Sequence, residues 1–213
     1  RCVEETVRVV SLVGVEYISK FLYSSFDEAL LAYNLKLVKL RDKYGFDAFK
    51  FRIGEVCGRN TDRWPGRTEE IVKKISKSFK GEIDLLVDAN SSYTPDKAIE
   101  ILKFLEDHGI SDFEETCPYW ELEWTKKVKD ALSIDVTGGE QDCDISIWNR
   151  MIDIKAVDIV QPDICYLGGL TRTLKIVALA NKAGLPCTPH SANLSMVTVF
   201  TLHMMGAISG GGK

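Results

Sequence analysis

Three acidic residues stand at equal intervals in the middle of this chain, each just after a short apolar stretch. Asp88 follows Leu-Leu-Val at 85–87, Glu114 follows Phe113, and Glu140 closes the stretch Val-Thr-Gly-Gly-Glu at 136–140. Both intervals are 26 residues long, about the length of a strand, a loop and a helix together. Because the carboxyl ends of parallel barrel strands meet at one rim, the three carboxylates are predicted to converge there.

Three converging carboxylates repel one another unless a cation lies between them. Hard oxygen ligands on rigid strand ends suit a divalent metal such as Mg²⁺. We therefore predict a Mg²⁺ site formed by Asp88, Glu114 and Glu140. Each acid alone would be more typical of a helix cap or a solvated loop, so the prediction depends on their convergence.

Two cations precede the first of these acids on an otherwise apolar stretch. Its alternation places Lys50 and Arg52 on one face and Phe49, Phe51 and Ile53 on the other. Two cations are costly in an ordinary apolar core, whereas a ring of carboxylates facing them would compensate their charge. A solvated pair on an edge strand is the alternative.

Composition argues against two classes of partner. The net charge is −4 and no block of lysine and arginine occurs, which argues against a nucleic-acid-binding protein. No apolar run reaches the roughly 18 residues of a membrane-spanning helix.

The six cysteines form no Cys-x-x-Cys pair, which is typical of reduced thiols in a cytoplasmic protein. Four of them follow expected strands and leave a zinc site as an alternative.

The elements that must position these residues alternate between strand and helix. Strands are predicted at 7–13, 48–54, 85–88, 112–114, 136–140, 156–163 and 186–190, and helices at about 25–44, 68–79, 95–108, 122–132, 145–154, 170–183 and 194–208. This gives seven βα units, and no eighth strand is predicted. We therefore predict one α/β domain over 1–213, an incomplete TIM-type (β/α) barrel. Because the chain begins without methionine and open strand edges invite pairing, we expect part of a longer protein or a homo-oligomer.

With Asp163 and His190 at the ends of the last two strands, the motifs follow one another at barrel spacing. They are Phe-Lys-Phe-Arg-Ile-Gly at 49–54, Val-Asp-Ala-Asn at 87–90, Phe-Glu-Glu at 113–115, Gly-Gly-Glu at 138–140, Gln-Pro-Asp-Ile at 161–164 and Pro-His-Ser at 189–191. In this order, from about residue 7 to 208, the chain resembles the enolase superfamily, and most of all its mandelate-racemase-like branch, which contains acid-sugar dehydratases.

The resemblance implies a mechanism and a role for each matched residue. Asp88, Glu114 and Glu140 would hold the Mg²⁺ that binds the substrate carboxylate and stabilises the enediolate. Two further sets complete the implied site: the catalytic residues Lys50, Arg52, Asp163 and His190, and the substrate-binding residue Asn90. His190 would be the base that removes the proton alpha to the carboxylate, oriented by Asp163, and Lys50 would add positive charge near that carboxylate. The implied activity is a hydro-lyase acting on a small-molecule sugar acid, an aldonate or aldarate.

Departures from the family pattern leave two alternatives. Arg52 stands where many relatives have a second lysine that acts as a base, and a guanidinium is a poor base at neutral pH. That weakens the alternative of a racemase or epimerase, which needs a base on each face of the substrate. The chain also lacks the family's capping domain and final strand, which leaves open an inactive barrel fragment without a closed site.

Overall fold

In the described part of the chain, six strands form one parallel sheet in the order of the chain. The computed structural model describes residues 9–11, 37–39, 41–79, 81–131, 133–191 and 195–209. The strands are β1 (Val9–Ser11), β2 (Ala48–Arg52), β3 (Asp84–Asp88), β4 (Ile110–Glu114), β5 (Asp135–Gly138) and β6 (Ile159–Val160), each hydrogen-bonded to the next. Parallel neighbours require a crossover, and helices supply it between most of them.

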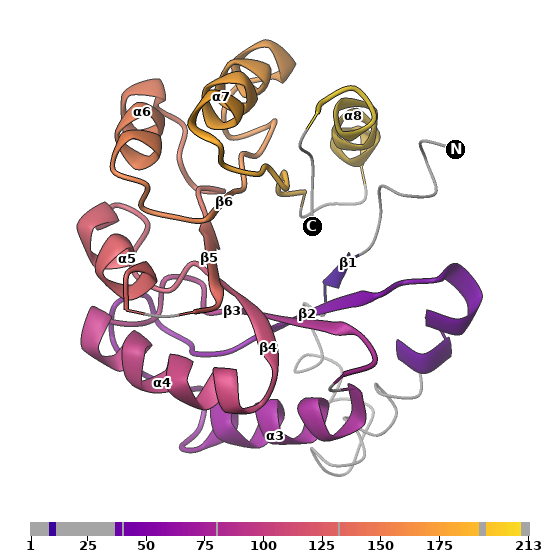
Figure 1. Ribbon diagram of the computed structural model, residues 1–213, viewed down its shortest axis with the longest axis vertical. Coiled ribbons are helices and arrows are strands. Elements are labelled where there is room, and N and C mark those ends of the chain that lie inside the picture. Colours follow the sequence, from indigo (N-terminus) through magenta and orange to yellow (C-terminus); the bar gives the residue numbers. More distant parts are fainter. Residues whose placement is uncertain are drawn as a thin grey trace.

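The helices lie outside the strands and follow one another around the curved sheet (Figure 1). They are α3 (Arg67–Phe79), α4 (Pro95–Asp107), α5 (Leu122–Lys129), α6 (Ile145–Asp153), α7 (Leu170–Ala183) and α8 (Met196–Met205). The predicted α/β fold with a parallel sheet is confirmed. Within the described ranges no helix has the length and apolarity to cross a lipid bilayer.

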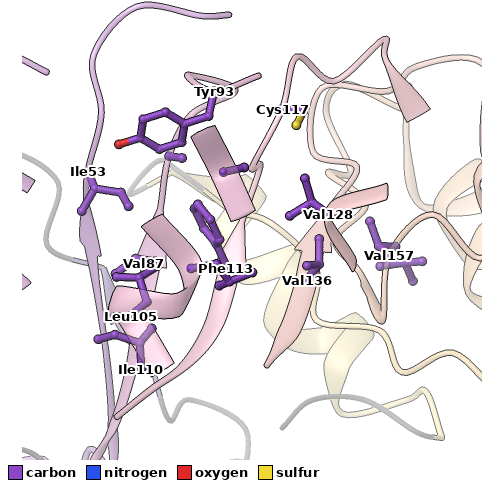
Figure 2. Close-up of a cluster of buried hydrophobic side chains, with 14 of the residues drawn as sticks. Ile53, Val87, Tyr93, Leu105, Ile110, Phe113, Cys117, Val128, Val136 and Val157 are labelled. Carbon is purple, nitrogen blue, oxygen red and sulfur yellow. The ribbon is translucent and has the colours of Figure 1, made fainter. Parts of the chain in front are cut away.

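Alternation along the strands builds the core beneath the sheet. Phe49, Phe51 and Ile53 are fully buried, as are Val87 and Phe113 on the neighbouring strands, and Figure 2 shows three of these side chains in the buried cluster. Full burial of one such side chain contributes about 1.5–3 kcal/mol. The core therefore fixes the strands whose other face carries the charged residues, as the alternation predicted.

The last two predicted strands pair over shorter lengths than expected. Stretch 156–163 contributes only β6, and 186–190 pairs through isolated bridges that join Val160 to Cys187 and Asp163 to His190. Three prolines explain the shortening, since Pro162, Pro186 and Pro189 have no backbone N–H to donate. Pro186 and Pro162 still accept hydrogen bonds, from the backbone N–H groups of Val160 and His190.

Other boundaries differ by a few residues. β5 ends at Gly138, so Glu140 lies in the following turn instead of on the strand, and α5 ends at Lys129 instead of near residue 132. The predicted strand 7–13 is described only as β1, and most of the predicted helix 25–44 lies outside the described residues. The seven-unit count, the missing eighth strand and the single domain over 1–213 stay predictions.

Candidate functional site

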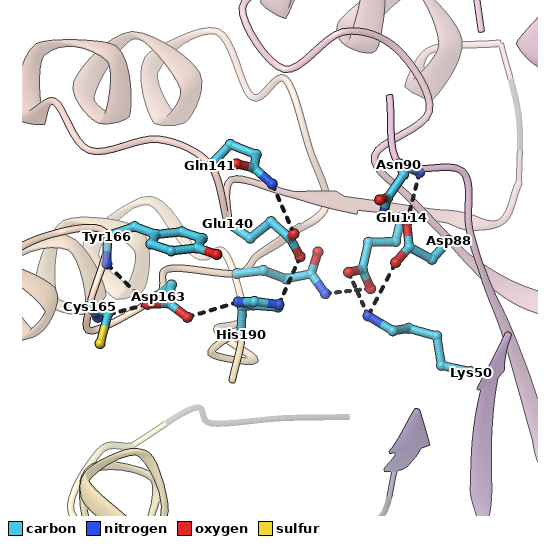
Figure 3. Close-up of polar contacts among 11 residues, drawn as sticks. Lys50, Asp88, Asn90, Glu114, Glu140, Gln141, Asp163, Cys165, Tyr166 and His190 are labelled. Atoms are coloured by element: carbon cyan, nitrogen blue, oxygen red, sulfur yellow. Dashed lines mark hydrogen bonds and ion pairs between the residues drawn. The ribbon is translucent and has the colours of Figure 1, made fainter. Parts of the chain in front are cut away.

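One end of the sheet brings the first three charged residues together. The register places Arg52 beside Asp88 and Asp88 beside Glu114 at the carboxyl ends of β2, β3 and β4. Lys50 lies two residues before Arg52 on the same face. Its Nζ lies 2.6 Å from Glu114 Oε1 and 3.7 Å from Asp88 Oδ2, as Figure 3 shows. The predicted meeting of these cations with strand-end acids is thus confirmed for Lys50.

Arg52 is placed differently from Lys50. Its side chain is half-buried and, within the described part of the chain, makes no hydrogen bond or ion pair. Its backbone carbonyl accepts a hydrogen bond from the buried Arg67 guanidinium. Lys50 is therefore bound to site carboxylates, whereas the Arg52 charge is uncommitted.

The turn after β3 fixes the orientation of Asp88. Asn90 donates twice to Asp88 Oδ1, from its backbone N–H at 2.8 Å and from its side-chain Nδ2 at 2.9 Å. Asn90 has a φ of 46°, a left-handed conformation that asparagine tolerates better than most residues. Asn90 thus holds Asp88 in place, and its contact with a substrate stays a prediction.

Glu140 lies in a turn that only glycine fits. The residue before it, Gly139, has a φ of 111°, and a Cβ there would lie 2.4 Å from the ring of Trp148. Trp148 is fully buried and donates its ring N–H to the Asp142 carbonyl. The packed tryptophan therefore sets the path of the turn and the place of Glu140.

Asp163 and His190 form the predicted pair. His190 Nδ1 lies 2.8 Å from Asp163 Oδ2, and the backbone N–H groups of Cys165 and Tyr166 donate to Asp163 Oδ1. The other imidazole nitrogen, Nε2, lies 3.3 Å from Glu140 Oε2. The Tyr166 ring stacks at 6.1 Å from the His190 ring. The turn after β6 thus fixes the carboxylate, and the carboxylate fixes the imidazole.

The buried charges change one another's protonation. Burial, with the charges of Glu114 and Asp88, raises the pKa of Glu140 to about 8, and burial with the charge of Glu114 also raises the pKa of Asp88. Burial acts in the same direction on Glu114, but the charge of Lys50 and the hydrogen bonds from Lys50, Gln161 and Glu140 together outweigh it and lower the pKa of that carboxyl. Burial opposes the charge on Lys50, yet Glu114 and Asp88 raise its pKa above the ordinary value. One ammonium is thus too little positive charge for three carboxylates.

A fourth acid, Glu115, is buried, although the residue that follows the strand-end acid Glu114 is expected from the sequence to face outward or into a loop. Only 6% of it is exposed. Burial, followed by the charges of Glu140 and Asp88, raises its pKa to about 9. Its φ of 45° turns the chain sharply after β4, and this turn breaks the strand alternation on which the expectation depended.

The chemistry of the donor set fits a divalent cation, but its present geometry is that of an ion-pair network. Among the described residues, no three histidine, cysteine or acidic side chains are arranged to hold a metal ion. Lys50 lies against two of the predicted ligands, and His190 lies against the third, Glu140. A buried cluster in which burial and the neighbouring carboxylates raise the pKa values of Asp88 and Glu140 is nevertheless the environment in which Mg²⁺ would replace protons.

Sequence reasoning missed Gln161, which reaches the centre of the site. Its Nε2 donates to Glu114 Oε2 at 2.9 Å. The available signal was spacing: Gln161 lies two residues before Asp163 in an extended segment, and residues two apart share a face. Tyr166 was also missed, and only its place in the turn after Asp163 pointed to it.

Comparison with known proteins gives three informative relatives. Arabinonate dehydratase of Saccharolobus solfataricus is 29% identical over 181 residues, which cover 81% of this chain and 46% of that protein. A crystal structure of a Roseobacter denitrificans protein provisionally named a racemase is 60% identical with a TM-score of 0.82, covering 85% of this chain and 50% of that one. The structure of L-talarate dehydratase from Polaromonas, complexed with Mg and L-glucarate, shares the fold at 22% identity and a TM-score of 0.71, covering 87% and 47%.

Further relatives include sugar-acid dehydratases, epimerases and a cycloisomerase. The chain spans about a third to a half of the length of the curated relatives it matches. Residues 33–212 match the family described as Enolase C-terminal domain-like, and this match contains every predicted site residue. The chain therefore belongs to the Enolase C-terminal domain-like family, as the order of its strand-end motifs indicated.

Proposed function

We propose that this chain carries the catalytic residues of a magnesium-dependent dehydratase that acts on a sugar acid, an aldonate or aldarate. The observation that supports it best is the His190–Asp163 pair facing a cluster of buried carboxylates with Lys50 among them. That combination joins a base to positive charge at the place where a substrate carboxylate would become more negative. It suits abstraction of the proton alpha to a carboxylate.

His190 is the base in this proposal. Its Nδ1 donates to Asp163, which leaves Nε2 as the nitrogen that accepts the proton. Nε2 now lies against Glu140, so a bound substrate takes the place of that contact. Asp163 orients the ring, because its carboxylate lies 2.8 Å from Nδ1 and is itself held by two backbone N–H groups.

Lys50 and Arg52 supply charge and not proton transfer. Lys50 is held by Glu114 with a raised pKa, and a guanidinium stays protonated at neutral pH. Both are therefore suited to stabilise the negative charge that develops on the substrate carboxylate. Asn90, next to Asp88, is proposed to contact the bound substrate.

Asp88, Glu114 and Glu140 would hold the metal ion. When bound, Mg²⁺ polarises the substrate carboxylate and acidifies the alpha proton. Metal binding would require these carboxylates to lose their present contacts with Lys50 and His190. The acids contribute the ligand oxygens, and the strand ends and turns contribute their fixed positions.

Racemisation or epimerisation is the second candidate, because the 60% identical Roseobacter protein is provisionally named a racemase. A racemase needs bases on both faces of the alpha carbon, and among the described residues near the carboxylates only His190 is suited to be one. In dehydration the same imidazolium can protonate the leaving hydroxyl. A single histidine that acts first as the base and then as the acid therefore favours dehydration over racemisation.

Product analysis with a panel of sugar acids and Mg²⁺ tests the proposal, with a full-length version of the protein as control. Dehydration gives a 2-keto-3-deoxy acid, whereas racemisation gives solvent deuterium at the alpha carbon without loss of water. Exchange without a keto acid would favour the second candidate. If the full-length protein forms neither product, both candidate functions are rejected and an inactive barrel is favoured. The cytoplasmic location and self-association stay predictions.

A further inference from the structure

Gln161 links the carboxylate Glu114 to the segment that carries Asp163. It follows β6 directly, is only 8% exposed, and donates its Nε2 to Glu114 Oε2 on β4. Lys50 donates to the other oxygen, Oε1, of the same carboxylate. Glu114 is thus held from both sides, and Gln161 connects it to the segment that also carries Asp163.

The other end of the Gln161 amide has no partner in the part of the chain that the structure describes. Its Oε1 is buried and accepts no hydrogen bond from the described residues, although a buried acceptor without a donor is unfavourable and rare. Turning the amide over would bring Oε1 against Glu114 Oε2, and two acceptors repel each other. The contact with Glu114 therefore fixes an orientation in which Oε1 needs a donor from elsewhere.

The position of this oxygen suggests the source of the donor. Gln161 and Asp163 are two residues apart in an extended segment, so their side chains share a face, and Asp163 holds His190. In the proposed mechanism a substrate separates His190 from Glu140, which now lie 3.3 Å apart. That movement would open the neighbourhood of Gln161 to the part of the substrate next to its alpha carbon.

We infer that Gln161 Oε1 accepts a hydrogen bond from a hydroxyl of the substrate, and that Gln161 thereby selects hydroxylated acids over apolar ones. The inference depends on the proposed function and narrows its substrate class. A site with a buried acceptor rejects an analogue that lacks the matching hydroxyl, because the acceptor is then left unpaired. Aryl and alkyl carboxylates offer no such donor.

Two substitutions and one matched control test this inference in the full-length protein. Gln161→Met keeps the length of the side chain but removes the acceptor, and Gln161→Asn keeps an amide that is too short to hold both contacts. Gln141→Met is the control, since Gln141 also donates to a site carboxylate, Glu140 Oε1 at 3.2 Å, but is exposed. Thermal melting shows whether each variant is folded.

Dissociation constants are measured by calorimetry with Mg²⁺ present. The probes are D-gluconate, D-galactonate and D-xylonate, each beside analogues lacking one hydroxyl. For the natural protein we expect one hydroxyl whose removal weakens binding by about tenfold or more. Gln161→Met and Gln161→Asn should lose that preference, and Gln141→Met should keep it. A merely structural role would weaken both acids of a pair equally and leave the preference unchanged.

The outcomes separate this inference from the proposed function. A preference that survives within twofold in folded Gln161→Met overturns the inference, whether or not the enzyme dehydrates sugar acids, and would assign Oε1 to a buried water. Hydroxyl-dependent binding that needs Gln161, without any keto-acid product, rejects the proposed dehydration and supports the inference. Failure of the natural protein to bind any probe overturns both.

Discussion

The candidate site has two halves that the fold positions by different means. Lys50, Asp88 and Glu114 lie on five-residue strands in parallel register, with one register shift between β3 and β4, at Leu85 and Leu86. Glu140, Asp163 and His190 lie in turns or at a single bridge, beyond the short strands β5 and β6. We call these the sheet half and the turn half.

The two halves differ in the interactions that hold their side chains in position. In the sheet half the ladder and the buried aromatic residues beneath it fix the carboxylates, so position follows from the core. In the turn half, local contacts replace the ladder: backbone N–H groups hold Asp163, and the Trp148 ring limits the turn before Glu140. We therefore expect changes in the turn half to affect function more than stability, unless they alter the turn itself.

The largest expected effect is the loss of the base in the turn half. His190→Asn should reduce exchange of the substrate alpha proton with solvent deuterium by about 10³-fold, because a positioned base contributes roughly 10²–10⁴-fold. Asp163→Asn should reduce it less, through a misoriented ring. NMR of the recovered substrate measures the exchange.

Both variants should melt within a few degrees of the natural protein, since no core side chain changes. Exchange that is unchanged in His190→Asn would place the base elsewhere. A large loss of melting temperature in either variant would show that the turn half also carries stability and would break the comparison.

The next effect concerns the charge balance of the sheet half. Lys50→Met should destabilise the metal-free protein by about 3 kcal/mol at pH 8, because it leaves Glu114 and Asp88 buried without their cation. Added Mg²⁺ should then raise the melting temperature more in the variant than in the natural protein, if the acids are the metal ligands. Chemical denaturation with and without Mg²⁺ measures both.

Lys129→Met is the matched control for this charge removal. Lys129 also pairs with an acid, Asp158 Oδ1 at 3.2 Å, but both side chains are partly exposed, so we expect a cost of at most about 1 kcal/mol. Equal costs in the two variants would mean that Lys50 is no more important to stability than a surface lysine. An equal response to Mg²⁺ would count against the metal site.

A third change alters the turn itself. Gly139→Ala should cost about 2–3 kcal/mol, because the new Cβ meets Trp148 and the φ of 111° is unfavourable for alanine. Gly184→Ala, with a φ of 76° but nothing within 4 Å of the new Cβ, should cost only about 1 kcal/mol. Denaturant unfolding of both variants gives the difference, and equal costs would show that the turn yields without strain.

The sequence predicted the sheet half better than the turn half, for a physical reason. Period-two alternation around Phe49 and Phe51 and an apolar run into Asp88 report burial directly, so strand ends and facing charges followed from them. Prolines shortened the later strands, which alternation does not reveal. The contact of Gln161 with Glu114 joins segments far apart in the chain, and no local pattern encodes it.

The smallest predicted effect concerns a surface link between the two halves. Glu106, on α4 beside the sheet half, accepts hydrogen bonds from the backbone N–H at 3.1 Å and the hydroxyl of Ser133, just before β5. These bonds lower the pKa of Glu106, so the folded state favours the carboxylate. The resulting stability is present above the pKa of the unfolded chain, near 4.5, and is lost as pH falls through the lower folded value.

Glu106→Gln should therefore cost less than about 1 kcal/mol at pH 7, because the pair is partly exposed, and less than that at pH 3. Denaturant unfolding of the natural protein and the variant at both pH values measures this difference. Ser133→Ala should give the same pH dependence if the hydrogen bonds are its cause. A cost that is constant with pH would show that packing of α4, and not the carboxylate, links the two halves at the surface.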